Sequence, residues 1–283
     1  MTNSASTHTQ EPVLIIEPGR TEKNYWADLW RYRELFIILA WRDISVRYKQ
    51  TIIGILWAII RPFLTMVVFT VIFSYIAKLP SDGSAPYTLL VFAAMLPWSL
   101  FSNALSESSN SLISNANLIG KVYFPRLIIP AATLVTAFTD FLISFIILIG
   151  MMLYYQFALG WQILLLPFFI IMTLLASLGP GLWMTAINVK YRDFRYIIPF
   201  VVQFGLYVSP VGFSSKVIPE QWRLIYNLNP MVGVIDGFRW CILGGDSSIY
   251  VPGFMLSLAI IAFFLYLGIT RFRKMEKTFA DIM

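Results

Sequence analysis

The sequence predicts an all-α integral membrane protein with six transmembrane helices. Hydrophobic residues make up 58% of its 283 positions and charged residues only 13%, whereas soluble domains typically contain about 45–50% and about 25%. Mean hydropathy is +0.71. A soluble fold of this size has too little interior to bury so many apolar side chains. A lipid environment accounts for the surplus.

The second observation is that the apolar residues gather in stretches long enough to span a bilayer. Crossing about 30 Å of hydrocarbon takes roughly 20 helical residues at about 1.5 Å each. Six stretches meet this need, near 52–77, 87–106, 127–154, 161–187, 196–213 and 251–270. The fifth is the weakest, because it is short and is interrupted by Pro199 and Pro210.

The third observation is an unequal distribution of positive charge. Sixteen of the 21 Lys and Arg residues precede the first stretch, follow the last, or lie in the second and fourth loops, against three in the opposite loops. The positive-inside rule therefore places both termini in the cytoplasm. We expect cytoplasmic tails at 1–24 and 276–283, with one integral domain at 25–275. The net charge of +6 reads as a topology signal, and no nucleic-acid partner is expected.

The segment 26–49 is expected to form an amphipathic helix ahead of the first stretch. Its apolar stripe follows helical spacing and comprises Trp26, Trp30, Ile37, Trp41, Ile44 and Tyr48. We interpret it as a helix lying in the membrane plane at the cytoplasmic interface. The alternative is a cytoplasmic helix packed against the bundle.

Two charges, Arg61 and Asp140, fall inside the expected spans. Intramembrane charges are costly and usually face a partner or a wet cavity. One interpretation is structural: the two form an ion pair, or Arg61 reaches toward the interface. The other is that Arg61 lines a pathway for an anionic substrate. Pro62 should kink its helix or open the hydrogen-bond ladder.

The segment 210–250 is too apolar for a solvated loop and is interrupted repeatedly by Pro and Gly. Such a pattern indicates re-entrant or surface-lying half-helices. They would form either an outer gate or a surface helix pair without a gating role.

The sequence offers no catalytic constellation. It has no P-loop, no HExxH, no GxSxG and no close pair of intramembrane carboxylates. One histidine, His8, and one cysteine, Cys241, exclude a histidine- or cysteine-rich metal site and an internal disulfide. We expect no catalytic residue, no metal and no cofactor in this chain.

Four stretches resemble type-2 ABC exporter permeases of the polysaccharide class, which export O-antigen, capsule or teichoic-acid polymers. In the order of that family they are WRDISVRYKQTIIGILWAIIRP at 41–62, NLIGKVYFPRLIIP at 117–130, NVKYRDFRYIIPFVVQFGLYVSP at 188–210 and NPMVGVIDGFRWCILG at 229–244. The resemblance covers roughly residues 25–275, and the upstream VLIIEPGR at 13–20 is similar to O-antigen members.

The resemblance implies a homodimeric permease in the bacterial inner membrane, joined to two copies of a separate ATPase that carries ATP and magnesium. Its substrate would be a polysaccharide on a polyprenyl diphosphate lipid. The helix at 26–49 would be a gate helix, a coupling helix would lie at about 107–121, and half-helices at about 213–245 would line the outer mouth. The residues implied in ATPase coupling are Asn115, Asn117, Lys121, Lys190, Arg192, Asp193 and Arg195.

Further candidates follow from the chemistry of this substrate. A lipid diphosphate attracts cations near the inner leaflet, which suits Arg42, Arg47 and Lys49 beside Trp41, although these residues equally serve orientation and lipid binding. Sugars stack on aromatic rings, so the channel candidates are Trp57, Arg61, Trp98, Phe101, Asp140, Trp183, Phe204 and Tyr207.

Two rival functions stay open at this stage. An exporter of lipids or drugs with the same architecture usually has a large insertion between the first two spans, for which residues 78–86 leave no room. A membrane-embedded transferase of glycan biosynthesis should show clustered His, Asp or Glu at the end of a span, and the sequence has no such cluster.

Overall fold

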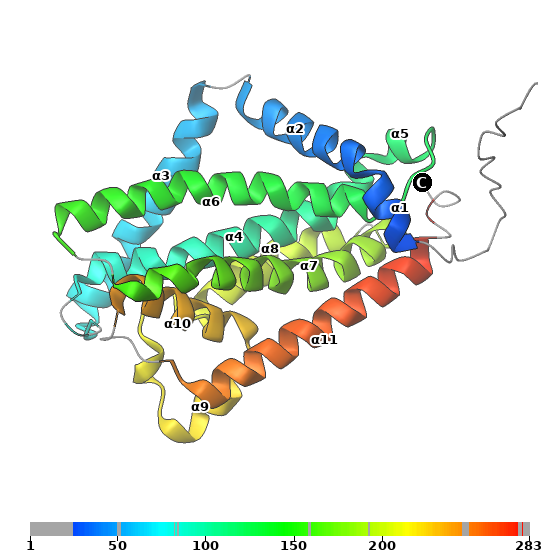
Figure 1. The fold of residues 1–283 in the computed structure, drawn as a ribbon. Helices are drawn as coiled ribbons and strands as arrows, with labels where there is room; N and C mark the ends of the chain where they lie inside the picture. Colours follow the sequence, from blue (N-terminus) through cyan, green and yellow to red (C-terminus); the bar gives the residue numbers. More distant parts are fainter. Residues whose placement is uncertain are drawn as a thin grey trace, which may run out of the picture.

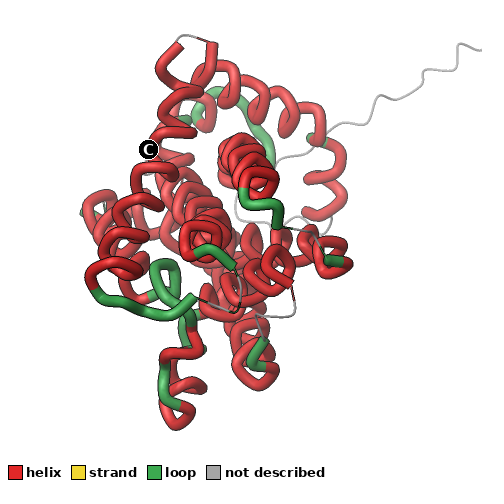
Figure 2. Tube along the Cα trace, turned by 90° about the vertical axis from the view of Figure 1, so that its left-hand side faces the viewer, coloured by secondary structure: helices red, strands yellow, loops and turns green. Residues whose placement is uncertain are grey.

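The protein is a bundle of long helices, with shorter helices at both ends (Figure 1). The computed structural model describes residues 25–49, 52–81, 83, 85–157, 160–191, 193–244, 249–276 and 279, and among these the regular structure is entirely helical (Figure 2). The α-helices are α1 (Tyr25–Arg31), α2 (Arg33–Lys49), α3 (Ile52–Phe69), α4 (Tyr87–Ser114), α5 (Ala116–Ile119), α6 (Ile128–Tyr154), α7 (Leu166–Lys190), α8 (Phe194–Val208), α9 (Glu220–Tyr226), α10 (Pro230–Leu243) and α11 (Val251–Glu276). A π-helical stretch η1 (Thr70–Ile76) extends α3, the 3₁₀ turn η2 (Trp161–Leu165) leads into α7, and η3 (Ser215–Val217) precedes α9.

Five of these helical segments are long and apolar enough to cross a membrane. They are Leu56–Ile76, Tyr87–Ser114, Ile128–Tyr154, Trp161–Lys190 and Val251–Glu276, so five of the six predicted spans are confirmed. The remaining one corresponds to α8, whose 15 residues reach only about 22 Å, short of about 30 Å. It is the stretch that its prolines had marked as weakest.

Helix α4 is the centre of the bundle. Nine of its first ten residues are buried, and it packs against α3, α6, α7, α8 and α10. The other long helices expose much of their apolar surface, as expected of helices that contact lipid or another subunit. Helix α4 is therefore a largely buried helix, and the long helices around it have an apolar outer face.

Close helix crossings depend on glycine. Where α7 crosses α11, a Cβ atom added to Gly268 would lie 2.1 Å from the carbonyl oxygen of Gly179. Where α10 packs on α7, a Cβ atom added to Gly237 would lie 1.9 Å from the ring of Phe169. Any larger residue would force these helices apart, because backbone and ring already fill the space.

The segment before the last span divides into a surface helix and a buried helix. α9 has no buried residue, whereas α10 is buried along almost its whole length. Asn229 caps α10 by accepting a hydrogen bond from the backbone N–H of Met231 (3.1 Å), and Gly244, at a φ of 73°, ends it. The expected half-helices are confirmed, one on the surface and one inside the bundle.

The course of α2 differs from the expected in-plane orientation. Arg42 contacts Asn115 at the end of α4, while Arg47 contacts Glu107 about two turns further into the same helix. Tyr48 reaches Asp140, which lies twelve residues into α6, or about 18 Å along that helix. Helix α2 is thus inclined along the bundle (Figure 1), and most of its apolar stripe points away from it.

The coupling helix expected at about 107–121 is also shorter than predicted. Helix α4 continues to Ser114, and only the four residues of α5 form a separate helix. The break falls at Asn115, whose side-chain N–H₂ donates to the carbonyl oxygen of Ser111 (2.8 Å). Asparagine competes for backbone hydrogen bonds in this way and favours helix ends.

Pro62 opens the hydrogen-bond ladder of α3, as expected. Because proline has no N–H, the carbonyl oxygen of Ala58 loses its helical donor. The hydroxyl of Ser144 on α6 lies 3.4 Å from that oxygen and donates to it. The gap in the ladder becomes a contact between α3 and α6.

Candidate functional site

A charged network joins the end of α2 to α4 and α6. The guanidinium of Arg47 lies 2.7 Å from one carboxylate oxygen of Asp140 and also pairs with Glu107. The hydroxyl of Tyr48 donates to the other oxygen of Asp140, and the side-chain amide of Asn103 lies 3.5 Å away. Asp140 therefore has three polar neighbours from two helices.

This network decides between the interpretations left open for the two intramembrane charges, because Asp140 does not pair with Arg61. Asp140 is 7% exposed, and a buried carboxylate is tolerated when it is paired and hydrogen-bonded. Its partner is Arg47 on α2. Arg61 is exposed on α3 and forms no ion pair within the described part of the chain. Because α2 is inclined along the bundle, Arg47 lies at the depth of Asp140. The sequence pattern does not reveal this inclination.

The surroundings of the network favour the protonated forms of both α2 residues, Arg47 and Tyr48. Burial lowers the pKa of the Arg47 guanidinium, but the carboxylates of Glu107 and Asp140 outweigh this effect and raise its pKa above the ordinary value. Burial, together with the hydrogen bond and the charge of Asp140, raises the pKa of the Tyr48 hydroxyl. Tyr48 therefore stays protonated and can donate at neutral pH.

The other gate-helix candidates are more accessible. Arg42 pairs with Asp43 at 2.6 Å and donates to the side-chain oxygen of Asn115 at 2.8 Å. Lys49 and Trp41 are exposed. Arg47 pairs with Glu107 and Asp140, and Arg42 pairs with Asp43, so of these three cations Lys49 is the most available to a ligand in the described structure.

The coupling candidates gather at one end of the bundle, where α4 and α7 end (Figure 1). Asn115 stands at the break between α4 and α5 and touches Arg42 on α2. The following described candidates are all exposed: Asn117, Lys121, Lys190, Asp193 and Arg195. Arg192 lies outside the described residues.

A second cluster, which the sequence pattern does not predict, lies at this same end. Glu276, the last residue of α11, accepts a hydrogen bond from the Tyr25 hydroxyl on α1 (3.0 Å) and another from the backbone N–H of Arg126 (2.7 Å). The Arg126 guanidinium donates to the Glu276 carbonyl oxygen (2.7 Å), and Arg273 lies over the Tyr25 ring. We call these four residues the C-terminal clasp. It ties α1, the loop before α6 and α11 together.

Several aromatic candidates are exposed on α3 and α8, two helices that meet where Phe69 contacts Tyr207. Trp57 on α3 is 58% exposed, and Phe204 and Tyr207 on α8 are 60% and 61% exposed. The Tyr207 ring lies 6.4 Å from that of Phe69, which connects the two helices. A further α8 ring, Phe200, stacks on Phe204 at 6.2 Å.

The remaining aromatic candidates lie deeper. Trp98 is buried, with its ring against Gly205 of α8 and 5.5 Å from the ring of Phe101. Phe101 and Trp183 are half-buried. Trp98 thus packs against α8 with Phe101 beside it, while Trp57, Phe204 and Tyr207 are exposed.

Arg239 on α10 is an anchor that the sequence analysis counted only as a loop charge. It is 1% exposed, and its guanidinium donates to the carbonyl oxygens of Leu90 (3.3 Å), Phe213 (2.9 Å) and Val211 (3.2 Å). The rigid fork of N–H donors suits Arg to bind several carbonyls at once. The signal in the sequence was a charge inside the apolar run VIDGFRWCIL.

Comparison with known proteins identifies the fold. Residues 34–243 match the family described as ABC-2 type transporter, which covers well over half of the chain. The chain belongs to this family. As an ABC-2 family member with five apolar helices of spanning length, it is a multi-pass membrane protein.

Curated relatives within the family span nearly the whole chain. An O-antigen export system permease protein RfbA from Klebsiella pneumoniae is 27% identical over 259 residues, covering 88% of this chain and 95% of the relative. The RfbA of Myxococcus xanthus is 26% identical, covering 75% and 81%. A more local similarity, 33% over 76 residues (26% of this chain and 30% of the relative), links the chain to the inner membrane transport permease YadH of Escherichia coli K12.

Proposed function

We propose that this chain is the transmembrane permease subunit of an ATP-driven exporter that moves lipid-linked O-antigen polysaccharide from the cytoplasm across the bacterial inner membrane. The observation that carries the proposal is similarity to a protein named as an O-antigen export permease, over 88% of this chain and 95% of the relative. The similarity to YadH covers about a quarter of it. A lipid or drug cargo therefore has weaker support.

The same proposal includes a homodimer with two copies of a separate ATPase. The exposed aromatic side chains of α3 and α8 support a second copy. Packing them against another subunit would add van der Waals contacts between the helices and cover an exposed apolar patch. The exposed polar residues around α5 and after α7 support the docking of a soluble ATPase at the end of the bundle where they lie. ATP and magnesium would bind to that partner.

In this assembly α8 would be the sixth span, made short by its prolines, and both termini would be cytoplasmic. The positive-inside distribution supports this topology. The helix α2 would border the entry path for the lipid-linked sugar, with Lys49 and Arg61 as the accessible cations for its diphosphate. The aromatic surface of Trp57, Phe204 and Tyr207 would face the passing glycan between the two copies.

The test compares a strain lacking this chain with its parent. Surface glycan is stained and lipid-linked polymer is extracted from the cell interior. The proposal expects loss of surface glycan together with accumulation of polymer inside. Unchanged surface glycan without accumulation would indicate another cargo, and loss of polymer in both places would indicate a biosynthetic enzyme.

A further inference from the structure

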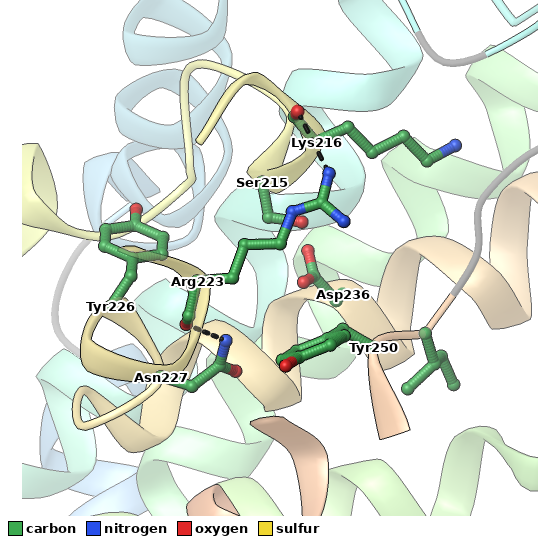
Figure 3. Close-up of a pocket in the computed structure, with 8 residues that line it drawn as sticks. Ser215, Lys216, Arg223, Tyr226, Asn227, Asp236 and Tyr250 are labelled. Atoms are coloured by element: carbon green, nitrogen blue, oxygen red, sulfur yellow. Dashed lines mark hydrogen bonds between the residues drawn. The ribbon is translucent and has the colours of Figure 1, made fainter. Parts of the chain in front are cut away.

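A small, partly open cavity lies among η3, α9 and α10, at the end of the bundle opposite the C-terminal clasp (Figure 1). Its lining residues come from η3, α9, α10 and the segment before α11 (Figure 3). Its volume is about 140 Å³, and its polar lining residues include Ser215, Lys216, Arg223, Asn227, Asp236 and Tyr250. Nothing in the transport pathway outlined above uses these residues. The cavity combines positive, negative, amide, hydroxyl and aromatic groups within one small volume.

The polar groups are held in place by the surrounding backbone. Arg223 donates from Nε to the carbonyl oxygen of Ile218 (3.2 Å) and from Nη2 to that of Lys216 (3.4 Å). These two bonds use part of its five N–H donors, and its guanidinium lies on the side of the cavity that faces Asp236 (Figure 3). A fixed arginine with spare donors is suited to bind a ligand oxygen.

Asn227 and Asp236 contribute acceptors. The Asn227 amide donates to the carbonyl oxygen of Arg223 (2.7 Å), which leaves its side-chain oxygen as an acceptor. Its position is tight, because a Cβ atom added to Gly253 would lie 2.4 Å from it. Asp236 is 7% exposed and projects from α10 into the cavity (Figure 3). Donors and acceptors therefore face the same space from different elements.

This mixture matches a sugar ring better than a simple anion or a metal ion. Each sugar hydroxyl both donates and accepts, so it can bond to Asp236 and Arg223 at once, and the C–H face of a pyranose can stack on the ring of Tyr250. Asp236 disfavours a phosphate, while Lys216 and Arg223 disfavour a metal cation. The volume suits one monosaccharide unit rather than a polymer segment.

We propose that this cavity binds one pyranose unit of the exported glycan as the chain leaves the permease on the outer side. The proposal rests on the proposed function and names a second contact for its substrate, away from the aromatic face of α3 and α8. A site at the exit would hold the emerging chain between ATPase cycles and disfavour its backward movement.

Photo-crosslinking in exporting cells tests the site. p-Benzoylphenylalanine is placed at Tyr250, on the rim of the cavity, or at Trp222, an exposed aromatic residue of α9 that does not line it. Benzophenone inserts into nearby C–H bonds, in which sugars are rich. After irradiation, the purified permease is stained for glycan and probed for lipid, and surface glycan is measured in the same cells.

We expect a glycan-bearing adduct at position 250 at least fivefold stronger than at 222, and a several-fold loss of that adduct in Arg223→Met and, independently, in Ser215→Ala. An equal adduct at both positions, no adduct at 250 while surface glycan is normal, or a lipid adduct in place of glycan would overturn the proposal. Absence of surface glycan export in the unmodified strain would instead contradict the proposed function itself.

Discussion

At the scale of single residues, the main finding is how Asp140 is tolerated within the bundle. Arg47, Tyr48 and Asn103 surround it, so the charge is balanced by a helix that the sequence pattern assigned to the membrane surface. The sequence revealed the cost of Asp140 and the apolar stripe of α2. It could not reveal their pairing, because that depends on the inclination of α2, a property of tertiary packing.

Removing Arg47 should therefore be more harmful than neutralising Asp140. Arg47→Met leaves Glu107 and Asp140 without their cation, and we expect a loss of about 1–3 kcal/mol in stability, discounted for the partial exposure of Arg47. Asp140→Asn keeps the hydrogen-bonding shape and leaves Arg47 paired with Glu107, so its effect should be smaller. Thermal unfolding of the purified proteins measures both, and equal melting temperatures for Arg47→Met and wild type would refute the structural role of the network.

Arg61 presents the opposite situation, a cation exposed on α3. Arg61→Met should insert normally and lower surface glycan, because the residue has no structural ion pair within the described chain to lose. Arg271→Met, which removes an exposed charge on α11, is the control and should export normally. Full export by Arg61→Met would exclude Arg61 from the substrate path.

At the scale of elements, the positions of the helices depend more on helix packing than on helix propensity. The apolar, glycine-rich run of α10 predicted a half-helix, and the structure shows why its glycines are needed, with Gly237 against Phe169. The clasp around Glu276 could not be read from the sequence, because a polar tail gives no local sign of which distant segment it contacts.

The crossing of α7 and α11 gives a sharp packing test. Gly268→Ala places a methyl group against the carbonyl of Gly179 and should destabilise the protein by about 1–3 kcal/mol through overpacking. Gly150→Ala in α6, where the added methyl meets nothing within 4 Å, should be neutral or slightly stabilising. The same melting temperature for both variants would show that the crossing is looser than described.

The C-terminal clasp predicts that α1 is anchored through Glu276. Glu276→Ala removes the acceptor for Tyr25 and for the Arg126 backbone, so the spin-label distance between α1 and the loop before α6 should broaden, and export should fall. Lys274→Ala, an exposed position two residues earlier, should leave both unchanged. An unaltered distance distribution in Glu276→Ala would show that other contacts hold α1.

At the scale of the whole molecule, the two ends of the bundle differ in character. One end carries exposed polar residues, the C-terminal clasp and the break at Asn115, and the other carries α9, α10 and the small cavity. The distribution of Lys and Arg predicted that the two ends differ, and hydropathy predicted five of the long helices. Hydropathy overestimated the length of the fifth stretch, because proline shortens α8. The packing around α8 cannot be read from its local sequence.

Transmission from a docked ATPase should pass through the residues after α7. Lys190→Glu reverses a charge that is exposed at this end, so export should fall severalfold while membrane insertion stays normal, with a matching loss of ATPase copurification. Lys216→Glu, at the other end of the bundle, is the control and should still copurify the ATPase. Retained ATPase binding and export in Lys190→Glu would remove this residue from the coupling surface.

The most direct test of the central claim is reconstitution of transport. The permease and its ATPase are placed in proteoliposomes with lipid-linked O-antigen, and the glycan remaining on the ATPase side is measured with a membrane-impermeant lectin. We predict an ATP-dependent loss of accessible glycan that requires both subunits. ATP hydrolysis by the assembled complex with no change in glycan accessibility would contradict the assignment of this chain as an O-antigen export permease.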